Sequence, residues 1–227
     1  MRKILAFTLA ETLIVMGIIG IVSALTLPNL NSSTGEKEKV AKVKKIYSNL
    51  NDALGRAQAV YGPYREWLSL DDNHDAQVTR FGERLTEFMK VSKTCALGSG
   101  CWSTSKFLLM DGTKKYDNYS DKISGYKIIL ADGTALAISI PSAAGKFVWF
   151  FVDIDGPNKG KTQSGSDIFD FTLSPATNYE IIPSKSPENW TGNIRDFYET
   201  AWVIYNENLD YLKCADELNW QTKTSCK

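Results

Sequence analysis

An acidic loop carries the side chains of this chain that are best spaced for metal chemistry. It begins with Asp153 and Asp155, continues through Asn158, and ends at Asp167 after a segment rich in Ser and Gly. Calcium binds roughly six to eight oxygen ligands, which carboxylates, amides, carbonyls and water supply on flexible loops. We therefore treat these four residues as candidate ligands of Ca²⁺.

Turn formation is the competing interpretation of the same loop. Asp, Asn and Gly favour turns whether or not a metal is bound. The first residues of the loop are similar to those of an EF-hand, but Ser164 stands where an EF-hand has its bidentate Glu. The sequence leaves both interpretations open, and no cofactor is required.

The four cysteines form two locally spaced pairs, Cys95 with Cys101 and Cys214 with Cys226. Disulfides are expected if the chain is exported, and local pairing is the simplest of the three possible connectivities. Zinc is the alternative, but neither pair has Cys-x-x-Cys spacing, and His74 is the single histidine of the sequence. We therefore predict two disulfides.

Enzymatic and nucleic-acid functions have little support in the sequence. His74 lies in a polar segment between Asp71 and Asp75, and the chain has no nucleophile elbow, Gly-rich phosphate loop or His-Glu-x-x-His zinc helix. Lys+Arg and Asp+Glu both number 26, so no net positive charge attracts nucleic acid. We expect a protein that is not an enzyme and that does not bind nucleic acid.

Glu11 is the single charge in an apolar run from Phe7 to Leu27. At about 1.5 Å per residue, a helix over this run is about 30 Å long, enough to cross the hydrocarbon core of a membrane. A carboxylate costs about 2.5–3.5 kcal/mol at the centre of a membrane, so it normally has a function and a partner there. Glu11 is close to the end of the run, where the cost is smaller.

The segment from Lys3 to Leu30 resembles the N-terminus of type IV pilins and of the pseudopilins of type II secretion. In that family a short basic leader is cut just before a Phe, and a Glu follows four residues later, as Phe7 and Glu11 do here. The resemblance implies cleavage by a prepilin peptidase between Ala6 and Phe7, followed by N-methylation of Phe7. It also implies an assembly contact between Glu11 and the Phe7 amine of a neighbouring subunit. Ala6 stands where the family usually has Gly.

Two other export signals compete with this interpretation. A secretory signal peptide would end at Ala24, but its apolar region is usually about 7–15 residues long, and this run is longer and contains Glu11. An uncut signal anchor leaves both Glu11 and Phe7 unexplained. We therefore prefer the pilin-like interpretation.

A helical pattern follows the apolar run, because apolar side chains recur every three or four residues from Val40 to Val60 and stop at Gly62 and Pro63. The expected fold class is α+β and pilin-like. A long N-terminal spine helix, with a transmembrane half and an amphipathic half, would pack on an antiparallel β-sheet head. The expected segments are a cleaved leader (1–6), a hydrophobic assembly helix (7–30), the amphipathic half (31–62) and the head (63–227).

Strand patterns dominate the head. Strands over residues 126–130 and 134–140 flank Ala131, Asp132 and Gly133, a combination that favours a tight hairpin. Further strands are expected over 146–152, 168–173 and 201–205, and a short helix over 78–89.

The resemblance implies a structural subunit of a type IV pilus or of a type II secretion-like filament. Its partners would be the membrane, which it crosses once before assembly, related subunits, the prepilin peptidase, and an assembly ATPase with its platform. The precursor would lie in the inner membrane, and the filament would be periplasmic or extracellular. Calcium is bound at a similar loop in some major pseudopilins. The alternative function is an exported or tethered binding domain that does not polymerise.

Overall fold

The computed structural model describes residues 9–69, 73–105, 107–113, 115–116, 125–142, 146–177, 180–184 and 198–226, with the side chains of 24–34, 115–116 and 142 left out. Its contacts divide the chain into two compact units, residues 1–38 and 39–227. Helix α1 (Leu9–Tyr61) contributes residues to both units.

The first unit contains an exposed apolar stretch of α1. Its large apolar side chains have between 52% and 79% of their surface exposed, and they are Leu9, Leu13, Ile14, Val15, Met16, Ile18, Ile19, Ile21 and Val22. Leu13, Ile14, Val15 and Met16 are consecutive, so they point to all sides of the helix. The stretch is therefore apolar all round and carries no single buried face.

The predicted spine helix with a transmembrane half is wrong. Within the described part of the chain, none of the helices combines the length and the apolar composition that a membrane span requires. Helix α1 is long, but its apolar part with described side chains covers only residues 9–23.

The second unit is built on the other part of α1, whose apolar stripe is buried. The stripe belongs to one core with the sheet and consists of Val40, Val43, Ile46, Leu50, Ala53, Leu54 and Ala57. Tyr47 stacks on Phe171 with ring centroids 5.7 Å apart. Asn51 donates to the carbonyl of Ile181 at 2.9 Å and accepts from its N–H at 3.0 Å. The amphipathic helix predicted up to Gly62 is confirmed.

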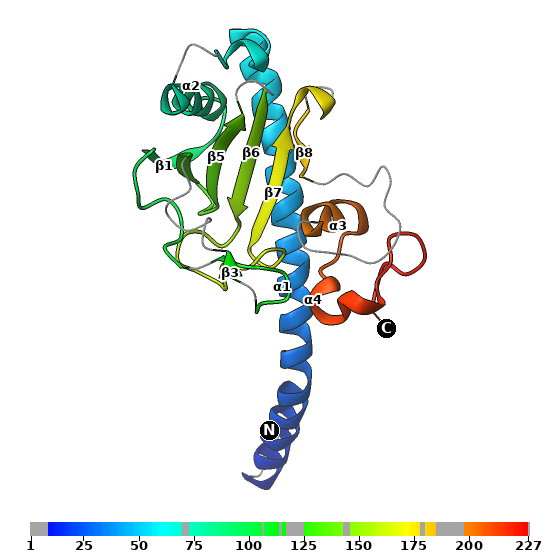
Figure 1. Ribbon diagram of the computed structural model, residues 1–227. Coiled ribbons are helices and arrows are strands. Elements are labelled where there is room, and N and C mark those ends of the chain that lie inside the picture. Colours follow the sequence, from blue (N-terminus) through cyan, green and yellow to red (C-terminus); the bar gives the residue numbers. More distant parts are fainter. Residues whose placement is uncertain are drawn as a thin grey trace. The chain divides into compact units, whose positions relative to one another are not determined.

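A six-stranded antiparallel sheet covers this stripe, in the order β1-β4-β5-β6-β7-β8. The strands are β1 (Val91–Ala96), β4 (Tyr126–Leu130), β5 (Ala135–Ser142), β6 (Phe147–Asp153), β7 (Ile168–Leu173) and β8 (Ile182–Pro183). The second unit therefore has an α+β architecture with an antiparallel sheet (Figure 1).

Short elements surround the sheet. They are η1 (Tyr64–Glu66), α2 (His74–Thr86), β2 (Phe107–Leu108), β3 (Lys115–Tyr116), η3 (Pro175–Thr177), α3 (Glu199–Asn206), α4 (Tyr211–Cys214) and η4 (Ala215–Glu217). Helix α2 contacts β4 and β5, and its Gly82 leaves no room for a side chain, because a Cβ there would lie 2.3 Å from the Tyr126 ring. The helix predicted near Val78 is confirmed.

The sheet is buried on both faces. A second apolar cluster packs against the face that is turned away from α1, and it consists of Trp102, Phe107, Leu109, Ala135, Ala137, Phe151 and Ile168. Leu136 and Ile138 of β5 belong instead to the core with α1, as the two-residue period of a strand requires.

The predicted hairpin is confirmed, because β4 and β5 pair through a turn in which Gly133 has a φ of +89°. The strand predicted over 201–205 is wrong, because these residues lie in α3. Tertiary contacts explain the difference: the Thr200 hydroxyl binds Asp170 of β7, and Trp202 packs edge-to-face on Trp220 with centroids 4.6 Å apart. These contacts bury one face of α3. A strand would turn successive side chains to opposite sides and could not bury the same set.

Both predicted disulfides are present. Cys95 is bonded to Cys101, at a sequence separation of 6, and Cys214 to Cys226, at a separation of 12. The first bond ties the end of β1 to the segment that contributes Trp102, and the second closes the C-terminal loop around α4 and η4.

We predict that the Cys214→Ser/Cys226→Ser variant loses about 3 kcal/mol of unfolding free energy, because the bond restricts the unfolded chain. Denaturant unfolding of the full-length protein measures the loss. The matched Cys95→Ser/Cys101→Ser variant removes a bond that closes a shorter loop, so its loss should be about 0.5 kcal/mol smaller. Unchanged unfolding midpoints in both variants would contradict a stabilising role.

Candidate functional site

The acidic loop joins β6 to β7 and is organised around Asp167. This carboxylate is 1% exposed and accepts hydrogen bonds from the Ser166 hydroxyl at 2.8 Å, from the N–H of Thr162 at 2.8 Å, and from the N–H of Lys161. Gly160 lies against it, because a Cβ there would be 2.5 Å from the Asp167 carboxylate. The loop thus folds around a buried negative charge.

Lys39, near the start of the α1 segment of the second unit, supplies the opposite charge. Its ammonium group lies 2.9 Å from Asp167 Oδ1, 2.9 Å from the Ser166 carbonyl, and 3.5 Å from Asp155 Oδ2. Lys42 Nζ approaches Asp155 at 3.9 Å. Burial alone would lower the pKa of Lys39, but its hydrogen bond to Asp167 and the charges of Asp167 and Asp155 outweigh this effect and raise the pKa.

Asp153, the last residue of β6, is a buried carboxylate whose hydrogen bonding is incomplete. It is fully buried, and its Oδ1 accepts from the N–H groups of Asp155 at 3.1 Å and Gly156 at 2.9 Å. Its Oδ2 is buried and has no hydrogen-bond partner among the described residues. Burial raises the pKa of Asp153 to about 7, although the two backbone hydrogen bonds oppose the shift and the nearby charges of Asp167 and Asp155 add to it.

Asn158 is bound to a different segment. Its Oδ1 accepts from the N–H of Thr104 at 3.0 Å and from the Thr104 hydroxyl at 3.0 Å, and it has a left-handed backbone with φ of +59°. The charges of Asp155 and Asp167 lie close enough to act on Asp153. Asn158 instead anchors the loop to the segment after Cys101.

The calcium site stays a prediction. Among the described residues, no group of three or more acidic, His or Cys side chains is placed to hold a metal ion. The positive charge between Asp155 and Asp167 comes from Lys39, so a cation that bound both carboxylates would have to displace this ammonium group. Among the side-chain oxygens of the loop that the structure describes, Oδ2 of Asp153 is buried and unpartnered, so a cation there would satisfy it directly.

The predicted assembly residue, Glu11, lies on an exposed part of the first unit. It occupies the first described turn of α1, next to Thr12, whose hydroxyl donates to the Leu9 carbonyl at 2.9 Å. The exposed apolar side chains of residues 9–22 surround it. Ala6 and Phe7, the predicted processing site, lie outside the described residues.

His74 is placed as a surface residue. It begins α2, its ring is exposed, and its Nδ1 lies 3.3 Å from Asp75. The same turn is capped by Asn73, whose side chain accepts from the Ala76 N–H at 2.8 Å. These contacts are those of a helix start.

Sequence reasoning missed Lys39 and Ser166, which complete the environment of Asp167. Lys39 stands 128 residues from Asp167 in the sequence, so no local pattern joins them. A signal was nevertheless present, because Lys39 and Lys42 are three residues apart, and side chains at that spacing share one side of a helix.

We predict that replacing Lys39 makes the loop sensitive to calcium. Lys39→Met removes the ammonium group from between two carboxylates, so the full-length variant should lose about 1–3 kcal/mol in chelator, and calcium should restore part of this loss. Thermal melts with calcium and with chelator measure both effects. The matched variant is Lys159→Met, an exposed lysine of the same loop. A calcium-dependent shift that is as large in the native chain as in Lys39→Met would contradict competition between Lys39 and the ion.

The raised pKa of Asp153 predicts a pH-dependent stability. The folded-state pKa of about 7 exceeds the ordinary value of 3.8, so the folded chain holds this proton more tightly than the unfolded chain does. The contribution of Asp153 is therefore most favourable below about pH 4 and is lost as the pH rises through 7.

Asp153→Asn removes this titration, and it should gain on the order of 2–4 kcal/mol relative to the native chain between pH 4 and pH 8. Denaturant unfolding at several pH values provides the measurement. Asp132→Asn is the control of opposite sign, because Lys45 and the Thr134 N–H overcome the effect of burial and lower the pKa of Asp132. A constant difference between Asp153→Asn and the native chain across this range would disprove the shift.

Comparison of the chain with models of protein families, with curated proteins and with solved structures found no match. Its function is therefore inferred from its own residues.

Proposed function

We propose that this protein is a structural subunit of a filament of the type IV pilus or type II secretion class, processed by a prepilin peptidase and polymerised through its N-terminal helix. The observation that carries the proposal is the exposed apolar stretch of α1 with Glu11 at its start.

This stretch needs a partner surface. Monomeric soluble proteins rarely expose large contiguous apolar patches, and a helix that is apolar all round is normally buried in a core or in lipid. Packing against the same stretch of neighbouring subunits would bury the exposed side chains of residues 9–22. A filament core made of such helices satisfies this requirement for every subunit.

Glu11 would supply the charged part of this contact between subunits. A carboxylate enclosed by apolar helices needs a cation, because an unpaired buried charge is costly. Cleavage between Ala6 and Phe7 would create a cationic amine on Phe7, four residues from Glu11 in the sequence. Pairing this amine with Glu11 of a neighbour would couple processing to assembly, since the uncut chain lacks the amine at Phe7.

The disulfides of the head suit a compartment outside the cytoplasm. Two disulfides within one chain are typical of oxidising compartments. We therefore place the precursor at the inner membrane with its head outside the cytoplasm, and the product in a periplasmic or extracellular fibre. An assembly ATPase with its platform would drive polymerisation, and the subunit would catalyse nothing.

The test is Glu11→Gln in the native host, compared with Glu38→Gln, which changes an exposed acid of the same unit. Losing a charge-assisted contact in an apolar environment should reduce filaments on electron micrographs about tenfold or more in Glu11→Gln. Glu38→Gln should keep the native number. Mass spectrometry should find both mature chains starting at a methylated Phe7.

Three results would refute the proposal. A mature chain that starts at Leu25 would indicate a secretory signal peptide and a free binding domain. A chain that keeps Met1 would indicate a plain anchor. An unchanged filament number in Glu11→Gln would remove the assembly contact.

A further inference from the structure

Side chains of residues 103–110 fasten this segment to the acidic loop. The N–H and the hydroxyl of Thr104 both donate to Asn158 Oδ1 at 3.0 Å. The hydroxyl of Ser103 lies 3.3 Å from that of Thr162, and both of these residues are buried. The acidic loop therefore depends on this segment for part of its anchorage.

Backbone hydrogen bonds continue the same contact through β2. The N–H of Leu108 donates to the Thr162 carbonyl at 2.9 Å, and the Leu108 carbonyl accepts from the Ser164 N–H at 2.9 Å. The side-chain amide of Gln163 donates to the Met110 carbonyl at 2.7 Å. Two segments that are distant in the sequence are thus joined along their length.

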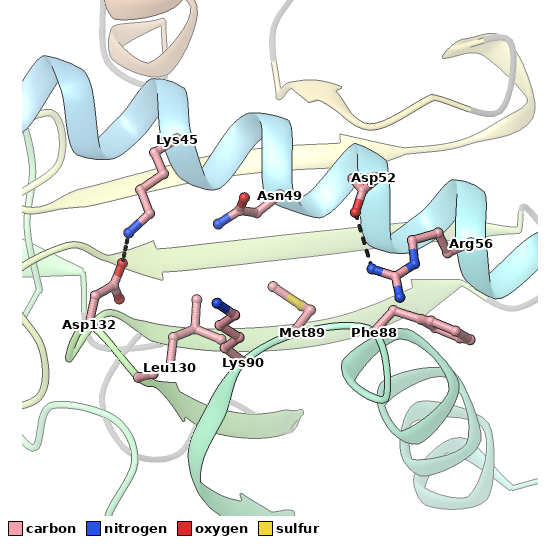
Figure 2. A pocket seen from close by; sticks show the side chains of 10 residues that line it. Lys45, Asn49, Asp52, Arg56, Phe88, Met89, Lys90, Leu130 and Asp132 are labelled. Carbon is pink, nitrogen blue, oxygen red and sulfur yellow. Dashed lines mark hydrogen bonds and ion pairs between the residues drawn. The ribbon is translucent and has the colours of Figure 1, made fainter.

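The Cys95–Cys101 bond ties residues 103–110 to a strand that is itself held in place. Cys95 lies in β1, which pairs with β4. Just before β1 the chain lines a groove along α1, whose third wall is the hairpin turn of β4 and β5 (Figure 2). In this groove the guanidinium group of Arg56 stands over the Phe88 ring, 5.2 Å from its centroid. The bond therefore extends the hold of the sheet and of α1 to the segment that anchors the acidic loop.

A positive charge stands beside this disulfide. Lys93 Nζ donates to the Gly100 carbonyl at 3.2 Å, which holds the ammonium group one residue from Cys101. Lys93 is the single charged residue of the sequence between positions 91 and 105. A nearby ammonium group favours thiolates, both the one that attacks a disulfide and the one that leaves it. These surroundings favour exchange with anionic thiols.

The C-terminal disulfide has surroundings of the opposite sign. Asp210 Oδ2 accepts from the Cys226 N–H at 2.8 Å. Residues 210–226 carry three carboxylates and two lysines, so this segment has one negative charge in excess. Each of the two disulfides has a half-buried cysteine. Charge, more than access, should therefore separate their rates of exchange with an anionic thiol.

Attack at Cys95 opens the first bond. Cys95 is half-buried and is followed by the exposed residues 97–100, whereas Cys101 is fully buried. An attacking thiolate forms a bond to Cys95 Sγ, and the electron pair of the old bond leaves on Cys101 Sγ, which takes up a proton. A second thiolate then displaces Cys95 from the mixed disulfide. In total, two thiol molecules are oxidised to one disulfide, and the protein disulfide is reduced to two thiols.

We propose that the Cys95–Cys101 bond is a redox switch for the acidic loop, opened by anionic thiols of the glutathione class and closed by the corresponding disulfide. The closed bond keeps residues 103–110 on the loop. When the bond is open, this segment keeps only its non-covalent contacts, so it separates from residues 158–164 more often. The inference goes beyond the proposed filament function and does not depend on it.

The first experiment treats the oxidised full-length protein with reduced glutathione and traps free thiols with an alkylating reagent at successive times. Mass spectrometry of the peptides measures how fast each disulfide opens. Cys95–Cys101 should open at least about tenfold faster than Cys214–Cys226, because the anionic thiol is attracted to the first and repelled by the second.

Replacement of Lys93 tests the charge that is held responsible. Lys93→Glu should slow the opening of Cys95–Cys101 by glutathione about tenfold, and by 2-mercaptoethanol less, since that thiol carries no further charge. Lys90→Glu is the matched control. It makes the same change at an exposed lysine about 10 Å away along the chain, and it should react as the native chain does.

The second experiment follows hydrogen exchange by mass spectrometry, in the protein opened by glutathione and in the Cys95→Ser/Cys101→Ser variant. In both, the amides of Leu108 and Ser164 should exchange about tenfold faster or more than in the native chain, because the segment has lost its covalent anchor. The amides of residues 148–152 in β6 should keep their native rates.

The inference fails if glutathione opens the C-terminal disulfide first or at the same rate, because the reactive site would then be absent. Native exchange rates at Leu108 and Ser164 in the opened protein would show that the bond does not hold the loop. An equal acceleration in β6 would indicate a general loss of stability and would also overturn the switch. The filaments of Glu11→Gln judge the proposed function separately, so either idea can fail while the other stands.

Discussion

Packing of the α1 stripe on the sheet is the contact on which the rest of the head depends. Seven apolar side chains between Val40 and Ala57 are buried against one face of the sheet. Burial contributes roughly 25 cal/mol per Å² of apolar surface, so this contact outweighs any single ion pair of the molecule. It also places the polar residues of the helix. Lys39 reaches the acidic loop, and Lys45 and Arg56 reach the groove, because both surfaces adjoin the helix that the stripe holds in place.

The acidic loop shows how one buried charge organises a long connection. Asp167 accepts several hydrogen bonds from its own loop and faces the ammonium group of Lys39, so the loop is closed from both sides. A lysine attached to the helix has one advantage over a free ion, since its effective concentration is fixed by the fold. Lys39 contacts Asp155 and Asp167, but Oδ2 of Asp153 stays without a hydrogen-bond partner among the described residues. Burial of this carboxylate raises the pKa of Asp153 to about 7.

Patterns of local origin were read correctly from the sequence. The stripe of α1, the hairpin at Gly133 and the pairing of nearby cysteines all follow from short-range spacing, and the structure confirms them. Contacts between distant segments were not accessible in this way. Lys39 and Asp167 meet only after the sheet has packed on the helix, and α3 is helical because β7 and Trp220 bury one of its faces. The predicted transmembrane half of the spine was wrong, because none of the helices in the described part of the chain is long and apolar enough to cross a membrane.

In the proposed fibre, the exposed apolar stretch of α1 would also determine how assembly responds to temperature. Burial of apolar surface is driven mainly by entropy near 25 °C and weakens on cooling, with a large change in heat capacity. The head has its own closed core with disulfides, whereas the first unit exposes its large apolar side chains. Fibres held together through these side chains would therefore be cold-labile. Chilling would release intact heads well before it disturbed their fold, and warming would let the same subunits assemble again.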